Sequence, residues 1–186
     1  MTSLARQRLL DDHRAVNQVL EHLLAALHNK DITASHSNLD LLWARLAVHI
    51  RAEHLHLFPA VLNRLSGSAD EVAGPDLSEA QSVVENLRTD HDFFMRGLAR
   101  AVGILRELPR PIDSTEGAAR LDTVLDIVLE TAKRLESHNR IEENQIYRWI
   151  STILTKPEQA ELATRIDAEL KNRPPRFSEE AWANRL

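Results

Sequence analysis

Apolar residues recur every three or four positions through most of the chain, the spacing of one face of an α-helix. Short connections between long helices favour an all-α fold, an up-down-up-down antiparallel four-helix bundle with a short fifth C-terminal helix beginning at Thr155. We expect residues 1–171 to form one domain and residues 172–186, with Pro174 and Pro175, to be an extended or docked tail. The expected helices cover about residues 3–28, 35–65, 78–108, 115–154 and 155–171.

Local signals refine the helix boundaries. Pro59 is expected to kink the second helix or to end it early, because proline cannot donate a backbone hydrogen bond. Ser78, with Gln81 three residues later, forms a possible capping box for the third helix. Ser114 or Thr115 is expected to cap the fourth helix.

Composition and charge narrow the class of protein. The chain is 43% hydrophobic and 4% aromatic with five glycines, a mixture that suits helices better than strands. The net charge of −5 comes from interspersed acids and bases, so no basic stripe suggests a nucleic-acid partner. The absence of cysteine excludes disulfides, thiolate metal sites and cysteine nucleophiles. No apolar run near the start resembles a signal peptide or membrane span, so we expect a cytoplasmic protein without membrane association.

The placement of histidines carries most of the chemical information. His49 and Glu53 in the second expected helix, and His138 and Glu142 in the fourth, are each four residues apart. Side chains at this spacing project from one face of a helix, about 6 Å apart, and can converge on one metal or on adjacent metals. The first and third helices each contribute one further histidine after an aspartate. The order is therefore His, then His-x-x-x-Glu, and then both again.

Positions along the helices agree with convergence, except at the last connection. His91 lies 17 residues before Leu108, whereas His138 lies 23 residues after Thr115. The difference of six residues is roughly 9 Å of helix. We therefore expect the fourth helix to start late or its first turns to overhang the third.

The donor set indicates the class of metal. Four imidazoles and two carboxylates without thiolate suit iron, with manganese possible, better than structural zinc or copper redox sites. We expect two ions, one held by the histidines of the first two helices and one by those of the third and fourth. Both glutamates would bridge them, with a solvent oxo or hydroxo group as third bridge, leaving each ion about one open position. The candidate metal ligands are His13, His49, Glu53, His91, His138 and Glu142.

At these positions the sequence resembles the haemerythrin-like cation-binding (HHE) family. The resemblance covers about residues 9–149 and implies a four-helix bundle around a carboxylate-bridged di-iron site. The motifs that carry it are Asp12-His13, His49-x-x-x-Glu53 running into Leu57-Phe58-Pro59, Asp90-His91, and His138-x-x-x-Glu142-Glu143 running into Ile146-Tyr147.

The sequence departs from the oxygen-carrying members of that family. Those proteins place a second histidine one turn from the first in helix three, where this chain has Leu87 and Met95. Their last carboxylate lies five residues after the helix-four histidine, whereas Glu142 lies four after His138. The missing histidine leaves both irons more open and argues against a purely reversible oxygen carrier.

Several neighbouring residues have more than one interpretation. His56 forms Glu53-x-x-His56, a spacing used by ferritin-like di-iron proteins, so its role as a further ligand stays open. His54 is interpreted as a surface residue, and Asp12 and Asp90 as capping or solvated residues in preference to partners of the histidines. We expect His22, His28 and His36 to be solvated. Phe94 and Met95 are interpreted as core packing, or as an apolar wall beside the metals.

Two functional hypotheses follow. The first is a non-haem di-iron protein that binds or reacts with a small ligand such as O₂, peroxide or NO. The second is a regulatory or iron-binding module whose iron-dependent folded state is read by a partner. The sequence leaves open whether the protein is an enzyme, as well as its electron donor and oligomeric state.

Overall fold

The computed structural model describes residues 4–67, 74–109 and 112–174, and all regular secondary structure within these ranges is helical. The predicted all-α class is therefore confirmed. None of the described helices combines the length and apolarity needed to cross a membrane. The long helices are α1 (Leu4–His28), α2 (Ile32–Ala52), α4 (Leu77–Glu107) and α5 (Thr115–Asn144). The shorter ones are the π-helical turn η1 (Glu53–Leu57), α3 (Phe58–Ser66), α6 (Ile146–Ile153) and α7 (Lys156–Lys171).

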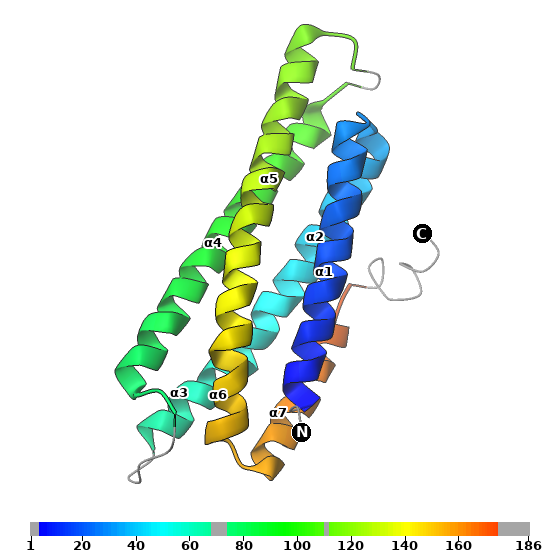
Figure 1. Cartoon of the computed structure of the whole chain (residues 1–186). Helices are drawn as coiled ribbons and strands as arrows, with labels where there is room; N and C mark the ends of the chain where they lie inside the picture. Colours follow the sequence, from blue (N-terminus) through cyan, green and yellow to red (C-terminus); the bar gives the residue numbers. More distant parts are fainter. Residues whose placement is uncertain (1–3, 68–73, 110–111, 175–186) are drawn as a thin grey trace.

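The four long helices form a bundle. Helix α1 packs against α2 and α5, and α4 packs against the same two helices, so the four enclose a common core (Figure 1). That core consists of two apolar clusters, one containing Val16, Phe94 and Leu135 and the other containing Leu9 and Leu87. On α1, His13 lies between Leu9 of the second cluster and Val16 of the first. On α4, His91 lies in the same way between Leu87 and Phe94.

Helix α7 extends the second apolar cluster. It packs against α1, α2 and η1 and buries Leu162, Ala163, Ile166 and Leu170. Its N-terminus carries a complete capping box, in which the Thr155 hydroxyl accepts from the Glu158 backbone and Glu158 accepts from the Thr155 backbone. The predicted start of a fifth helix at Thr155 is therefore confirmed. Residues 175–186 of the expected tail lie outside the described residues.

Two of the helix caps test the predicted boundaries. Ser114 caps α5 by accepting a hydrogen bond from the Gly117 backbone, as one of the two alternatives predicted. The capping box predicted for Ser78 and Gln81 is wrong. Asp76 caps α4 instead, and its side chain accepts a hydrogen bond from the Glu79 backbone N–H. Asp76 directly precedes the helix and has an extended backbone conformation, as an N-cap residue requires.

Pro59 does not end the helical path; it lies at the start of a separate helix, α3. The helical path continues to Ser66, but it passes through the π-helical turn η1 immediately before Phe58. In this turn the Phe58 backbone N–H donates to the Glu53 carbonyl, five residues earlier. The wider turn places Pro59 in the first turn of α3, where its missing N–H costs little.

The fourth predicted helix is interrupted. Helix α5 begins at Thr115, so the predicted late start is wrong, and Arg120 pairs with Glu107 near the end of α4. The first turn of α5 therefore lies beyond the end of α4, as the overhang alternative requires. At Gln145 the backbone leaves the helical path (φ −117°, ψ −79°), and α6 starts anew at Ile146.

Candidate metal centre

The six residues singled out by spacing come together at the middle of the bundle. They form two four-residue clusters, and in each cluster the candidate donor atoms lie within 4.8 Å of one another. We call the cluster around His13 and His49 half-site A, and the cluster around His91 and His138 half-site B. Both half-sites contain the same two glutamates, Glu53 and Glu142.

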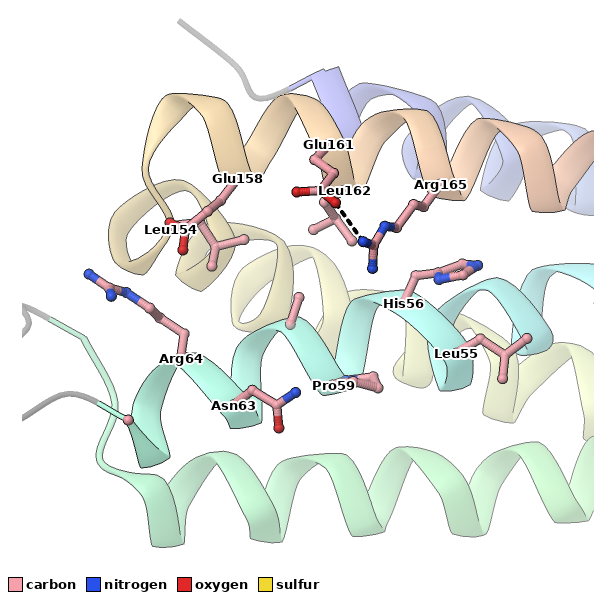
Figure 2. A pocket seen from close by; sticks show the side chains of 12 residues that line it. Leu55, His56, Pro59, Asn63, Arg64, Leu154, Glu158, Glu161, Leu162 and Arg165 are labelled. Atoms are coloured by element: carbon pink, nitrogen blue, oxygen red, sulfur yellow. Dashed lines mark hydrogen bonds and ion pairs between the residues drawn. The ribbon is translucent and has the colours of Figure 1, made fainter.

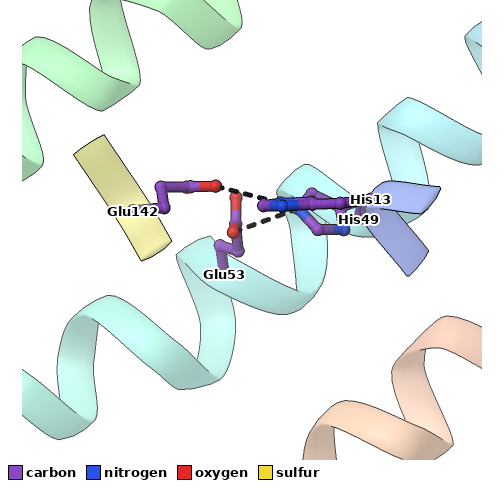
Figure 3. Close-up of side chains that lie close together, drawn as sticks. All are labelled: His13, His49, Glu53 and Glu142. Atoms are coloured by element: carbon purple, nitrogen blue, oxygen red, sulfur yellow. Dashed lines mark ion pairs between the residues drawn. The ribbon is translucent and has the colours of Figure 1, made fainter. Parts of the chain in front are cut away.

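Each glutamate directs one carboxylate oxygen toward each half-site. In half-site A, Nε2 of His49 lies 3.1 Å from Oε1 of Glu53, and Nε2 of His13 lies 3.2 Å from Oε2 of Glu142 (Figure 3). In half-site B, Nε2 of His91 lies 3.3 Å from the second oxygen of Glu53. Nε2 of His138 lies 3.3 Å from the second oxygen of Glu142. The four imidazoles thus face the carboxylates through the same ring nitrogen.

The centre is almost completely withdrawn from solvent. Glu53 and Glu142 are 0% exposed, and each of the four histidines exposes at most 4% of its surface. Burial raises the pKa of Glu142, but the charge of His138 and the hydrogen bond from His13 outweigh it and hold that pKa well below its usual range. Burial also lowers the pKa of His49, but the charge of Glu53 and the bond to Asp12 raise it well above normal. The pKa values of His13 and His138 are raised as well, so protonated imidazoles are favoured beside the buried carboxylates when no metal is bound.

Two of the histidines are anchored by aspartates on neighbouring helices. Nδ1 of His49 donates to Asp12 at 3.0 Å, and Nδ1 of His138 donates to Asp90 at 3.2 Å. The interpretation of both aspartates as capping or solvated residues is therefore wrong. Each aspartate precedes a histidine of its own helix but reaches the histidine of another helix, because adjacent residues on a helix point about 100° apart.

The other two histidines have different anchors. Nδ1 of His13 donates to Glu143 at 3.0 Å, whereas Nδ1 of His91 lies 2.9 Å from Nε2 of His54. His54 is half-buried, so its interpretation as a surface residue is wrong. His54 points away from His49, as its spacing in the helix requires. In that direction it meets α4, where its ring lies beside the ring of His91.

Arginines complete both aspartate anchors. Arg45 donates to Asp12 at 2.9 Å, and Arg134 donates to Asp90 at 2.6 Å. Each arginine lies four residues before the histidine that its aspartate holds. The internal repeat is thus longer than His-x-x-x-Glu: it reads Arg-x-x-x-His-x-x-x-Glu and includes the next residue, His54 or Glu143. The longer repeat is visible in the sequence, although it does not show which residue of another helix each member contacts.

Tyr147 belongs to the centre, although no spacing rule identified it. Its side chain is fully buried, and its hydroxyl oxygen lies 3.0 Å from Nε2 of His13. The same oxygen lies 3.3 Å from one oxygen each of Glu53 and Glu142. Burial and these two carboxylates raise the pKa of Tyr147 well above its usual value, so the metal-free residue is a neutral phenol.

The remaining histidines lie outside both half-sites. His56 approaches Glu169 at 3.7 Å and lines a surface groove of about 390 Å³ between α3 and α7 (Figure 2), so it contributes no donor to either cluster. His22 and His28 are exposed, as expected, and His36 is half-buried. Phe94 is fully buried, as expected for core packing, and its ring lies edge-on to His138.

The residues present fit a pair of cations. In the part of the chain that the structure describes, Oε2 of Glu53 and Oε1 of Glu142 are buried and accept no hydrogen bond, although Nε2 of a histidine lies 3.3 Å from each. A buried carboxylate oxygen is costly unless a cation, either a protonated histidine or a metal ion, lies beside it. Both face half-site B, and the Nδ1 anchors leave every Nε2 facing the carboxylates, where a metal ion would take the place of the Nε2 proton.

The fold and the site together describe a helical-bundle protein with two histidine–glutamate clusters that could each hold a metal ion. The chain matches the family model of the hemerythrin HHE cation binding domain over residues 4–150, and it belongs to this family. The resemblance noted from the motifs is thereby confirmed. No curated protein and no solved structure matches the chain significantly.

Proposed function

We propose that this protein binds two iron ions and that the resulting centre binds or reacts with a small ligand such as O₂, peroxide or NO. The observation that carries the proposal is the sharing of both buried glutamates by two four-residue clusters. One ion alone would leave part of this donor set unused. Nitrogen and oxygen donors without thiolate suit iron, and manganese is the second candidate.

The assignment of ligands follows the two half-sites. His13 and His49 would hold one ion, His91 and His138 the other, and Glu53 and Glu142 would bridge them. A bound iron pair supplies redox-active Lewis acids with positions open to a small ligand.

The protein's own residues orient the donors and keep water out. The carboxylates of Asp12, Asp90 and Glu143 accept the Nδ1 protons of three histidines, which fixes the ring orientation and makes each Nε2 a stronger donor. Apolar side chains of the two core clusters lie on either side of the centre along the length of the bundle, and they exclude solvent. Only a small molecule can reach so enclosed a site without opening the bundle.

The direct test is the metal content of the purified protein, measured by elemental mass spectrometry after growth with iron. We expect about two irons per chain in the wild type and loss of most iron in the double variant Glu53→Ala/Glu142→Ala. The matched control, Glu85→Ala/Glu136→Ala, removes two exposed glutamates and should retain full iron. Stoichiometric zinc or no metal in the wild type would contradict the proposal.

A second measurement addresses the small ligand. The visible spectrum of the iron-loaded protein should change on addition of O₂ to the reduced form, or of peroxide or NO. A spectrum unaffected by all three would remove reactivity from the proposal and leave metal binding alone. In that case the alternative, an iron-dependent module whose folded state a partner reads, becomes the better hypothesis, because buried ionisable groups are expected to make folding depend on bound metal.

A further inference from the structure

The two half-sites differ at one pair of equivalent positions. The repeat that relates Arg45, His49 and Glu53 to their counterparts in α5 also relates the residues five positions after each glutamate. These residues are Phe58, which stacks on His91, and Tyr147, which packs on His13. The two aromatic rings occupy corresponding places, but only Tyr147 carries an oxygen.

The oxygen of Tyr147 lies among the donor atoms of half-site A. Its neighbours are Nε2 of His13 and the carboxylate oxygens that Glu53 and Glu142 direct toward this half-site, at 3.0, 3.3 and 3.3 Å. Ligands bound to one ion at about 2.0–2.2 Å and at right angles are about 3 Å apart. The spacing of the phenol oxygen from the three donors is therefore that of a neighbouring ligand of the same ion.

A hydrogen bond to His13 is a poorer account of this position once metal is bound. Nδ1 of His13 donates its proton to Glu143, so Nε2 is the nitrogen left to bind a metal. While its lone pair binds a metal, Nε2 cannot accept a hydrogen bond from the phenol. The phenol would then keep close contact with a nitrogen to which it cannot hydrogen-bond. Coordination removes this conflict.

Half-site B has no equivalent donor among the described residues. Phe58 and Phe94 present only ring carbons to His91 and His138. The carboxylate oxygens that face this side lie 3.3 Å from the histidines and accept no further contact from a hydroxyl in the described part of the chain, whereas their counterparts in half-site A also contact Tyr147. Half-site B is therefore both poorer in protein donors and lined by apolar walls that suit a small ligand.

We infer that Tyr147 is a fifth protein ligand of the ion held by His13 and His49, and that the external ligand binds at the ion held by His91 and His138. This inference rests on the proposed di-iron function. When the oxygen of Tyr147 bonds to iron(III), its O–H bond breaks and the proton passes to solvent; no electron is transferred.

The chain has a single tyrosine, which makes the spectroscopic test unambiguous. Tyrosinate bound to iron(III) gives a visible charge-transfer band and resonance-enhanced ring vibrations, and here both can come only from Tyr147. We expect these signals in the iron-loaded wild type and their loss in Tyr147→Phe, with iron content retained. Thr131→Val, which removes another buried hydroxyl, should keep them.

Azide tests which ion is open. We expect the oxidised wild type to bind about one azide per chain and Tyr147→Phe to bind about two, because a second coordination position becomes free. Phe58→Tyr should reduce azide binding by adding an oxygen beside half-site B. The exchanged variant Phe58→Tyr/Tyr147→Phe should restore about one azide with altered spectra.

The outcomes separate this inference from the proposed function. Iron-loaded wild type without tyrosinate signals would overturn the inference while leaving the di-iron centre intact. Tyrosinate signals with unchanged azide stoichiometry in Tyr147→Phe would overturn the assignment of the open ion. A wild type without iron would overturn the proposed function and the inference with it.

Discussion

In each histidine of the centre, the two ring nitrogens make different contacts. Nε2 faces the carboxylates, and Nδ1 faces an anchor on another helix. Three anchors are carboxylates, and the fourth is His54, the partner of His91. A carboxylate increases the electron density of the imidazole more than a neutral histidine does. The anchors therefore make the ring of His91 the weakest of the four donors, again on the side of half-site B.

The substitution Asp90→Asn tests the anchors. The amide still accepts a hydrogen bond from Nδ1 of His138 but no longer carries the charge that strengthens the ring as a donor. We expect metal affinity to fall by about 10–100-fold, measured by competition with a chromophoric chelator. Asp92→Asn is the matched control, because Asp92 is exposed and pairs only with Arg96 among the described residues. Equal affinities in the two variants would mean that packing alone orients His138.

The protonation of His138 predicts a pH dependence for the metal-free protein. Burial lowers the pKa of His138, but the charge of Glu142 and the hydrogen bond to Asp90 outweigh it and raise the pKa from 6.5 to about 10. A raised pKa stabilises the folded state fully below pH 6.5 and progressively less as the pH rises toward 10. The pKa values of His13 and His49 are also raised, so they act in the same direction.

We therefore expect the free energy of unfolding of the metal-free protein to fall between pH 7 and pH 10, measured by urea denaturation. The iron-loaded protein is the control, since metal replaces the protons on Nε2 and should flatten the dependence over this range. A metal-free protein as stable at pH 10 as at pH 7 would contradict the protonation of the centre.

At the scale of helices, both glutamates shared by the two half-sites are followed by an irregularity. The π-helical turn η1 begins at Glu53, and the break at Gln145 comes three residues after Glu142. In an uninterrupted α-helix, a residue five positions after a glutamate would point roughly 140° away from it. The irregularities turn Phe58 and Tyr147 back toward the centre instead. π-helical turns often occur at functional sites, and η1 lies next to the candidate metal centre.

These irregularities explain what the sequence could and could not predict. His49 and Glu53, like His138 and Glu142, lie within one regular turn, so helical spacing placed them on one face correctly. Tyr147 was missed because the helix was assumed to be continuous through Gln145. Asp12 was misinterpreted for another reason: its partner is on another helix, and helix spacing does not determine how neighbouring helices are rotated against each other.

Helix α7 offers a test of stability that is independent of the metal. Ile166 is completely buried in the second apolar cluster, between α7 and the bundle. We expect Ile166→Ala to lower the free energy of unfolding by about 2–5 kcal/mol, because it leaves a cavity. Thr164→Ala, at an exposed position of the same helix, is the control and should change it by less than about 0.5 kcal/mol. An Ile166→Ala protein of wild-type stability would mean that α7 is not integral to the fold.

For the whole molecule, we expect metal binding and folding to be coupled. The centre joins all four long helices, and it concentrates six buried ionisable side chains where a helical bundle would otherwise have apolar ones. A ligand that binds only the folded state stabilises it in proportion to its affinity. The bundle should therefore be markedly less stable without its ions.

Removal of metal by a chelator tests this coupling. Free metal at about 100 times its Kd contributes about 2.7 kcal/mol for each site, so we expect the Tm to fall by several degrees on chelation. His22→Ala, which removes an exposed histidine outside both half-sites, should show the same fall. A shift of only a degree or two in the wild type would argue against iron-dependent folding and hence against the regulatory hypothesis.

The repeated Arg, His and Glu positions have a consequence for the origin of the molecule. Each half of the chain, α1 to α3 and α4 to α6, supplies one aspartate–histidine pair and one Arg-x-x-x-His-x-x-x-Glu segment. Two identical helical hairpins would build the same centre as a symmetric dimer. Joining them in one polypeptide, as a gene duplication does, frees the copies to diverge. A phenol could then arise beside one ion and a phenyl ring persist beside the other, a difference that no homodimer of hairpins could encode.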